Sequence, residues 1–214
     1  MAPRVVLVDY GIGNLLSVQR GFEYWGINAE ITDNPKTILM ADRVVLPGVG
    51  SFRLGMSELI KRGLADAIRD VAISGVPLLA ICLGMQLLFD FGEEHGLTNG
   101  LGIIPGHVSR ISPVTSNNRK LRVPHIGWNA IYGLSKDSNW EDTLLEGLKP
   151  QSEVYFNHSF IAIPNDSKDV EAVCDYGDYV VTSVVRNGAT TGCQFHPEKS
   201  GEIGLKILKN FINQ

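Results

Sequence analysis

Continuous apolar runs predict buried strands in the first half of the chain. These runs are short and rich in branched side chains, and they lie at residues 4–10, 42–47 and 76–81. A run that is apolar at every position suits a strand covered on both faces, which is typical of parallel sheets. We therefore expect these strands to lie at the centre of the fold.

Apolar residues at helical spacing follow these runs. The segments with this spacing are 15–25, 56–74 with an interruption at Gly63, and 85–91. Strands that alternate with helices favour an α/β fold, in which helices flank a mainly parallel central sheet.

The second half of the chain has a different pattern, with more glycine and proline and shorter apolar segments. The segments that suit strands are 106–112, 128–133, 153–163, 170–176, 179–185 and 190–195. The pair Asn187-Gly188 between the last two is a strong hairpin signal, so we expect antiparallel additions to the sheet.

A helix is expected to close the chain. Apolar residues recur there on one helical face, at Ile203, Ile207, Leu208, Phe211 and Ile212. No internal repeat, low-complexity tract or linker divides the sequence. We therefore expect residues 1–214 to form a single domain.

Composition and charge exclude several classes of partner. The chain has 214 residues, 44% of them hydrophobic, which is enough for one well-packed core. Its net charge of −4, without a run of lysine or arginine, gives no electrostatic footprint for nucleic acid or an anionic membrane. The apolar run before Asp9 is too short for a signal peptide or a membrane span, so we expect a cytoplasmic protein.

The three cysteines suit a reducing compartment, because they lack the C-x-x-C spacing of a structural zinc site or a disulfide framework. Cys82 directly follows the apolar run at 76–81. Ligands of parallel sheets bind beyond the carboxyl ends of the strands, and a turn into a helix there would aim amides at the sulfur. Gly84 would let that helix approach the strand closely, as in a nucleophile elbow. Cys82 is therefore a candidate nucleophile.

A nucleophilic cysteine needs a base, because an unperturbed thiol with a pKa of roughly 8.5 is only a few per cent thiolate at neutral pH. Among the five histidines, His196 leaves an apolar strand in the motif QFHPEKS. Pro197 disfavours a helix there, so we expect extended backbone that projects His196 and Glu198 to the same side. This pair would supply a base and the carboxylate that orients it.

Tetrahedral intermediates also need amide donors for their oxyanion. The glycine-rich loop LPGVGSF, at residues 46–52, follows an earlier strand and lets backbone N–H groups approach a substrate. We expect one donor from residues 48–50 and another from the N–H group of Leu83.

Each feature also has a plainer explanation. Cys82 suits a small buried hydrophobe, Pro47 and Gly48 suit a simple turn, and most histidines beside a glutamate have no catalytic role. Cys82, His196 and Glu198 are also legitimate zinc ligands. A triad accounts for the strand-end position of Cys82 without a metal or other cofactor.

Two other functions remain alternatives. The segment DYGIGN, at residues 9–14, suits a phosphate-binding loop of a nucleotide-binding module. It lacks the third glycine of G-x-G-x-x-G, and no acidic residue ends a clear second strand at the usual distance. A peptidase-like thiol hydrolase with its cysteine at the same turn is the other alternative.

Three motifs together resemble a known family. PGVGSF, CLGMQLLF and HPEKSG, beginning at Pro47, Cys82 and His196, are similar in order and spacing to the signatures of the triad-type glutamine amidotransferases. These enzymes hydrolyse glutamine through a cysteinyl thioester. The resemblance argues against the peptidase through Gln86 and the H-P-E spacing.

Further motifs extend the resemblance over nearly the whole chain. VDYGIGNL, VPHIGWN and YFNHSF resemble the glutaminase subunit of imidazole glycerol phosphate synthase. This likeness implies a flavodoxin-like glutaminase domain without a cofactor. It also implies a heterodimer with a barrel-shaped cyclase subunit, to which ammonia is channelled for histidine biosynthesis.

The resemblance also implies roles for single residues. Cys82 matches the nucleophile, His196 the general base and acid, and Glu198 the residue that orients it. Positions that hold the substrate L-glutamine match Gln86, Glu94 and Gly48. The oxyanion hole matches the loop at Val49 and Gly50 and the amide of Leu83. Segments that face the synthase contain Asn14, Tyr155 and Lys199.

The sequence departs from the family pattern in two places. Asn157 and Phe160 stand where an apolar residue and a tyrosine are expected, and residues 112–120 suit a loose, solvated loop. We expect neither departure to touch the triad. They do leave another ammonia acceptor open, a sugar amidotransferase of surface-polysaccharide synthesis.

Overall fold

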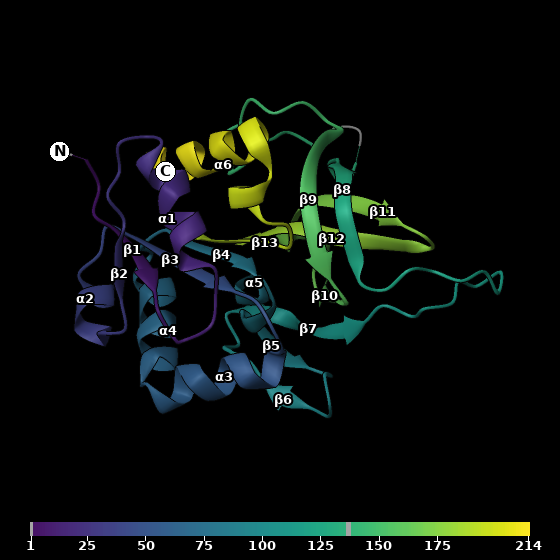
Figure 1. Cartoon of the computed structure of the whole chain (residues 1–214), viewed down its shortest axis with the longest axis horizontal. Helices are drawn as coiled ribbons and strands as arrows, with labels where there is room; N and C mark the ends of the chain where they lie inside the picture. Colours follow the sequence, from purple (N-terminus) through teal and green to yellow (C-terminus); the bar gives the residue numbers. More distant parts are fainter. Residues whose placement is uncertain (1, 136–137) are drawn as a thin grey trace.

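The computed structural model describes residues 2–135 and 138–214. Across these two ranges the strands form a seven-stranded sheet, a four-stranded sheet and a two-stranded ribbon (Figure 1). The strands of the large sheet are, in spatial order, β11 (Val170–Tyr176), β12 (Tyr179–Asn187), β13 (Thr190–Cys193), β4 (Leu78–Cys82), β3 (Arg43–Gly48), β1 (Val5–Val8) and β2 (Glu30–Thr32).

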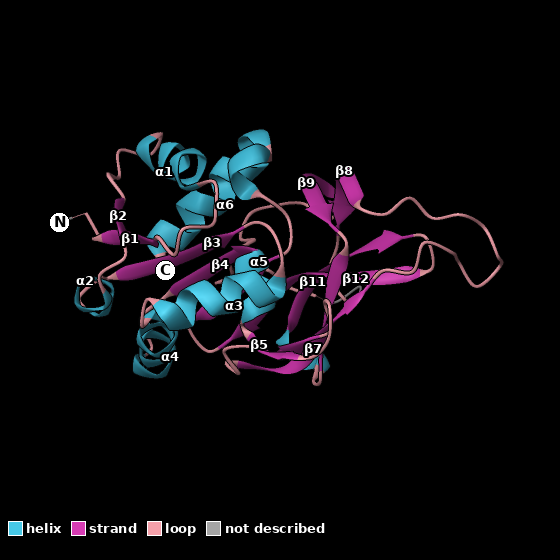
Figure 2. Ribbon diagram, turned by 60° about the horizontal axis from the view of Figure 1, so that its bottom comes forward, coloured by secondary structure: helices cyan, strands magenta, loops and turns pink. Residues whose placement is uncertain are grey.

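The large sheet is parallel from β13 to β2, and antiparallel pairing begins at β12. Helices cover both of its faces (Figure 2). One face carries α1 (Leu15–Glu23) and α6 (Gly201–Asn213), and the other carries α2 (Pro35–Leu39), α3 (Phe52–Lys61) and α4 (Leu64–Ser74). The predicted α/β architecture with antiparallel additions is confirmed. In the described part of the chain, no helix is both long and apolar enough to cross a membrane.

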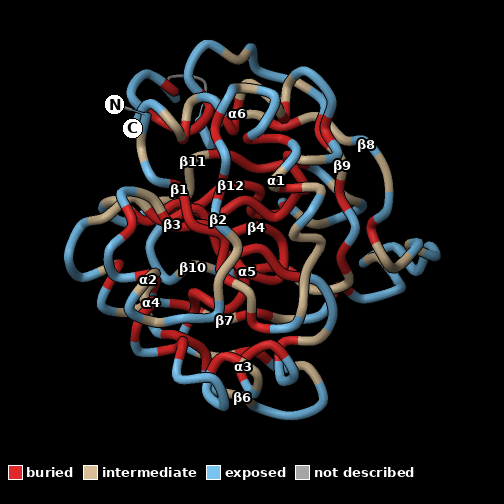
Figure 3. Tube along the Cα trace, turned by 60° about the vertical axis from the view of Figure 1, so that its left-hand side comes forward, coloured by how far each residue is buried: buried red, intermediate tan, exposed pale blue. Residues whose placement is uncertain are grey.

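Alternate residues of the central strands pack into two separate cores. Val5 and Leu7 of β1 join the cluster under α1 and α6, whereas Val6 and Val8 join the cluster under α3 and α4. Because both faces of the strand are buried, every position of the run is apolar. Figure 3 shows the strands as a buried centre within an exposed outer shell.

The smaller sheet and the ribbon lie beside β11 and β12, the strands at one edge of the large sheet (Figure 1). The strands of the smaller sheet are β10 (Phe160–Pro164), β7 (Ile104–Arg110), β5 (Phe89–Gly92) and β6 (Thr98–Asn99). The ribbon pairs β8 (His125–Ile131) with β9 (Ser152–His158). Two short 3-10 turns, η1 (Ser167–Asp169) and η2 (Pro197–Lys199), precede β11 and α6, respectively.

Several predicted boundaries are confirmed. Gly63 separates α3 from α4 with a φ of 68°, and α6 follows the predicted closing helix. The hairpin between β12 and β13 turns where expected, although its two unpaired residues are Gly188 and Ala189.

The predicted helix at 85–91 is wrong beyond its first residues. The helix α5 spans only Leu83–Leu87, and β5 follows at Phe89 because it pairs with β7 of the smaller sheet. Residues 83–89 are all buried, so periodicity could not mark where the helix ends.

Other differences are local. The first helix ends at Glu23, so Trp25 lies beyond it, and the helix expected from residue 56 begins at Phe52. The short second strand β2 was not predicted, because its partly exposed residues form no apolar run. Asp33 does follow that strand, but it forms an ion pair with Arg62 at 3.7 Å.

Gly84 lies where helix α5 packs tightly against strand β3. A Cβ atom at this position would lie 1.9 Å from the carbonyl oxygen of Leu46, a backbone atom that cannot turn aside. We expect Gly84→Ala to lower the free energy of unfolding by about 1–3 kcal/mol or more, measured by urea denaturation. Ile73→Ala, at a site that is 84% exposed, is the control and should change it by no more than about 0.5 kcal/mol. Equal urea midpoints for Gly84→Ala and the wild type would contradict this packing.

Candidate active site

The register of three parallel strands brings the predicted site together. Gly48 at the end of β3 lies opposite Cys82 at the end of β4, and Cys193 at the end of β13 lies opposite Ile81. The carboxyl ends of these strands therefore meet at one edge of the sheet. The glycine-rich loop, the candidate nucleophile and the segment that leads to His196 all emerge there, where parallel sheets bind ligands.

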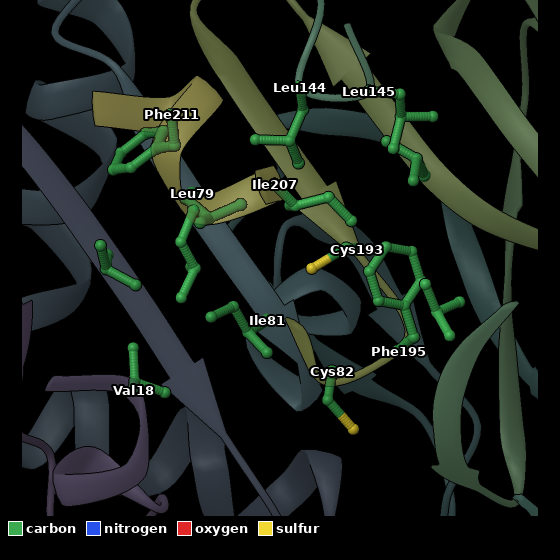
Figure 4. Packing of buried hydrophobic residues seen from close by; sticks show 14 of the residues in the cluster. Val18, Leu79, Ile81, Cys82, Leu144, Leu145, Cys193, Phe195, Ile207 and Phe211 are labelled. Atoms are coloured by element: carbon green, nitrogen blue, oxygen red, sulfur yellow. The ribbon is translucent and has the colours of Figure 1, made fainter. Parts of the chain in front are cut away.

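Cys82 sits on a strained turn between β4 and α5. Its φ of 54° and ψ of −109° lie in a region that L-residues rarely adopt, at a typical cost of about 1–3 kcal/mol. The residue is 6% exposed. Figure 4 shows its side chain at the margin of the apolar cluster, with the sulfur directed away from Cys193 and Ile81. The turn thus presents the thiol outward from an otherwise apolar core.

His196 and Glu198 form a buried pair. Nδ1 of His196 lies 2.8 Å from Oε1 of Glu198, and the two side chains are only 3% and 2% exposed. The expectation of extended backbone is confirmed for His196 only, because Pro197 begins the 3-10 turn η2. The tighter turn still places both side chains on one side, and proline suits its first position because that N–H group has no partner to lose.

The charge around His196 favours its protonated form. Burial by itself lowers the pKa of the imidazole, but hydrogen bonds and charge from Cys82 and Glu198 outweigh this effect and raise the pKa to about 10. An imidazolium between these two acidic groups can donate a proton to a leaving group beside the sulfur.

Hydrogen bonds hold the backbone of His196 against the ribbon. Its N–H group donates to the carbonyl of Tyr155 at 2.9 Å, and its carbonyl accepts from the Ser200 hydroxyl at 2.6 Å. The same hydroxyl accepts from the N–H group of Tyr155 at 3.0 Å. Two of these bonds join strand β9 to the residues that flank the turn η2, and the third closes the turn between Ser200 and His196. The backbone that carries the imidazole is therefore held by both elements.

A pocket of about 250 Å³ opens in front of Cys82. This volume is below the range typical of drug-sized ligands and suits a small substrate. Of the predicted site residues, those that line the pocket are Val49, Gly50, Cys82, Leu83, Gln86, Glu94, His196 and Lys199. A larger hollow of about 660 Å³ lies at the opposite, amino end of β4, and none of the predicted site residues lines it.

Gln86 and Glu94 both face the pocket and are both tied to the fold. The side-chain amide of Gln86 donates to the carbonyl of Phe160 at 3.1 Å and to Oε1 of Gln194 at 3.0 Å. Oε2 of Glu94 accepts from the N–H group of Phe52 at 2.7 Å, at the start of helix α3. These bonds fix the two side chains before a substrate arrives.

Gly48 does not line the pocket. A Cβ atom there would lie 2.3 Å from the hydroxyl of Tyr10 and 2.9 Å from the backbone nitrogen of Gly84, so glycine is required for packing. Val49 and Gly50 border the pocket from the loop, opposite Leu83 at the start of α5. The three residues predicted for the oxyanion hole therefore line one pocket together with Cys82.

Two of the three residues predicted to face a partner lie together. The ammonium of Lys199 is 6.0 Å from the ring centroid of Tyr155, and Trp128 packs edge-on against that ring at 6.1 Å. Trp128 is 55% exposed. Asn14 lies in the loop after β1, at the same edge of the sheet, where it precedes helix α1.

The pocket wall contains residues that received no role from the sequence. Pro124, Asn157, His158, Ser159 and Phe160 line it from the ribbon and β10. The expectation that the unusual residues avoid the triad is wrong for Asn157, because its carbonyl oxygen lies 3.9 Å from the Cys82 sulfur. Since Asn157 and Phe160 contact the site through backbone carbonyls, the identity of their side chains does not alter these contacts.

A buried histidine pair supports this wall. Nδ1 of His125 lies 3.0 Å from Nε2 of His158, and Nδ1 of His158 lies 2.9 Å from the carbonyl of Phe160. Burial lowers the pKa of His125 to about 4 and that of His158 to about 3. Both rings are therefore neutral at pH 7 and act as fixed hydrogen-bond partners. The motifs VPHIGWN and YFNHSF contained both residues, but only the fold pairs them.

The arrangement of the triad differs from that of a metal site. Within residues 2–135 and 138–214, no group of three or more His, Cys, Asp or Glu side chains is arranged to hold a metal ion. His196 instead bonds Glu198 through Nδ1 and lines the same pocket as Cys82, which is the arrangement expected of a base between an orienting carboxylate and a nucleophile.

Comparison with known proteins agrees with this geometry. The chain is 41% identical over 208 residues to imidazole glycerol phosphate synthase subunit HisH 1 of Legionella pneumophila (strain Lens), covering 97% of this chain and 98% of that protein. It is 45% identical to subunit HisH of Syntrophotalea carbinolica, with the same coverage. It is also 43% identical to imidazole glycerol phosphate synthase hisHF of Arabidopsis thaliana, covering 98% of this chain but 34% of that protein.

Solved structures support the fold. A crystal structure of a glutamine amidotransferase superposes with a TM-score of 0.72 at 18% identity, covering 97% of each chain. The structure of PurLQS from Thermotoga maritima gives a TM-score of 0.71 at 19% identity, covering 100% of this chain and 99% of that chain. The family model "Glutamine amidotransferase class-I" matches residues 6–214. The chain therefore belongs to the class-I glutamine amidotransferases.

Proposed function

We propose that this chain is the glutaminase subunit of an imidazole glycerol phosphate synthase, and that residues 1–214 act as one catalytic unit. The observation that carries the proposal is the buried pair of His196 and Glu198, with His196 and Cys82 lining the same small pocket. The support for this particular synthase is identity of 41% and 45% over nearly the full length of proteins named subunit HisH. Because these relatives carry the name of the synthase of histidine biosynthesis, the alternative acceptor, a sugar amidotransferase, is not favoured.

The first half of the reaction forms a thioester. The Cys82 thiolate attacks the side-chain carbonyl carbon of glutamine, and a C–S bond forms as the carbonyl becomes an oxyanion. When the intermediate collapses, the C–N bond breaks and His196 gives its proton to the departing nitrogen. Ammonia leaves, and the glutamyl group stays on sulfur.

The second half releases glutamate. His196, now neutral, takes a proton from water as the hydroxide attacks the thioester carbon. The C–S bond then breaks, and Cys82 leaves as a thiolate. Glu198 stays hydrogen-bonded to Nδ1 and keeps the ring in the orientation that both proton transfers need. No metal or other cofactor takes part in these steps.

Polar groups around the pocket suit the two ends of glutamine. Amides of Val49 or Gly50 and of Leu83 would stabilise the oxyanion, and each such donor is worth about 10²–10³-fold in rate. Gln86 and Glu94 would hold the polar end of the substrate, because both line the pocket and are fixed by the fold.

Ammonia is useful only if it reaches an acceptor before it is protonated in water. The relative named hisHF is about three times as long as the segment that this chain matches, since the match covers 34% of it. We propose that a separate cyclase subunit docks over the pocket of this chain as a heterodimer and receives the ammonia. Asn14, Tyr155 and Lys199, at the same edge of the sheet, would face that subunit.

The triad assignment predicts graded losses of activity. Cys82→Ala should abolish glutamate formation from glutamine, because no other group can form the thioester. His196→Ala should lower kcat by about 10²–10⁴-fold, and Glu198→Gln by less, because a base remains when only its orientation is lost. Circular dichroism controls for folding, and wild-type turnover in Cys82→Ala would reject the assignment.

The raised pKa of His196 predicts an alkaline limit to activity. The imidazolium that protonates the departing nitrogen is lost as pH rises through about 10, so kcat/KM should fall with a midpoint near that value. Glu198→Gln removes one of the groups that raise this pKa, so its midpoint should lie at lower pH. Identical alkaline limbs for the two proteins would contradict the proposed charge balance.

The partner proposal predicts coupling between subunits. We expect glutaminase turnover to rise when the cyclase subunit of the same organism is added, and product formation to match glutamine consumed. The matched control is Cys82→Ala, which should still support product formation from added ammonium salt. Equal turnover with and without the cyclase would count against docking over this pocket.

A further inference from the structure

Gln194 is a buried amide with no role in the reaction described above. It follows β13 directly, has no exposed surface, and its backbone N–H group donates to the carbonyl of Ser183 at 2.9 Å. Burying an amide without hydrogen-bond partners costs about 1–3 kcal/mol. The partners of the Gln194 side chain therefore indicate its role. One of these partners is the sulfur of Cys82, 3.8 Å from Nε2.

The carbonyl of Phe160 sets which way the nearby amides face. This oxygen lies 3.1 Å from Nε2 of Gln86, and a carbonyl only accepts, so the NH₂ group of Gln86 must point toward it. The same NH₂ group lies 3.0 Å from Gln194. Gln194 must therefore present its oxygen to Gln86.

This orientation leaves only the NH₂ group of Gln194 to face Cys82. Flipping the amide would place an oxygen against the sulfur and two NH₂ groups against each other. The carbonyl oxygen of Phe160 therefore fixes the orientation of both amides. The chain of hydrogen bonds ends with an N–H group of Gln194 that donates to the sulfur of Cys82. The neutral His158, which donates from Nδ1 to the same carbonyl, holds that backbone atom in place.

We propose that Gln194 is a further catalytic residue, whose amide donates to the Cys82 sulfur and stabilises the thiolate. Gln86 is then a positioning residue as well as a pocket residue, because it holds that amide in the donating orientation. Hydrogen bonds to charged groups are stronger than those between neutral groups, and a fixed donor needs no reorganisation during the reaction. The proposal rests on the proposed function only in taking Cys82 as the nucleophile.

The test measures the thiolate without using glutamine. Iodoacetamide forms a C–S bond with a thiolate and releases iodide, so the rate at Cys82, followed by mass spectrometry of its peptide, reports thiolate at each pH. His196, Tyr10 and Cys193 also interact with the charge of Cys82 and are unchanged in the variants. A difference between proteins therefore reports on Gln194.

We expect Gln194→Leu to lower the alkylation rate at pH 7 by about tenfold or more, and to move the midpoint of the rate profile to higher pH. Gln194→Glu keeps an oxygen for Gln86 to bond but turns a carboxylate toward sulfur, so its rate should fall at least as far. Gln86→Leu should give a smaller loss, because the amide of Gln194 is then free to rotate. At high pH, where every thiol is ionised, the rates should converge.

Ser183→Ala is the matched control, since Ser183 is equally buried and keeps the carbonyl that accepts from Gln194. Its profile should match that of the wild type. Profiles of folded Gln194→Leu or Gln194→Glu that superpose on the wild type would overturn the proposal. Because alkylation needs no glutamine, this result is separate from any failure of the glutaminase assays.

Discussion

The register of three neighbouring parallel strands is the constraint on which the site depends. With Gly48 opposite Cys82 and Ile81 opposite Cys193, the three strand ends are level, and the loops that follow them share one small volume. A slip of one residue would turn every side chain of a strand to the other face. Because these strands are buried on both faces, such a slip would exchange the two apolar cores, and packing opposes it.

Strain at the nucleophile is balanced by this packing. Cys82 has a positive φ, which only a well-determined environment maintains. Gly84 permits α5 to lie against β3, and the buried residues of α5 hold the turn from the other side. The fold thus stores a modest amount of unfavourable energy where the sulfur must face outward.

Polar groups around the sulfur are connected to two different parts of the molecule. His196 is bonded through its backbone to Tyr155 of the ribbon, whereas Gln194 is bonded through Gln86 to Phe160 of β10. The ribbon also carries the exposed side chain of Trp128, which packs against Tyr155. A subunit that docks on the ribbon would therefore contact an element that directly holds His196, the proposed catalytic base.

The sequence by itself determined the central fold and the choice of Cys82, His196 and Glu198 as the proposed triad. Apolar runs at 4–10, 42–47 and 76–81 predicted the parallel strands, because burial on both faces leaves a continuous signal in the sequence. Cys82 was singled out because it directly follows the run at 76–81, and His196 because it leaves the predicted strand at 190–195. Family motifs added Gln86 and Glu94, since short motifs keep their spacing within the chain.

Only the tertiary structure decided where α5 ends, which backbone atoms reach the sulfur, and how the buried amides are oriented. These features depend on contacts between residues far apart in the chain, such as Gln86 with Gln194 and Cys82 with Asn157. The local sequence around a residue does not reveal the hydrogen-bond partners of its side chain when those partners come from other strands. The polarity of the amides around Cys82 follows from one carbonyl on β10, and no local pattern in the sequence records that carbonyl's position.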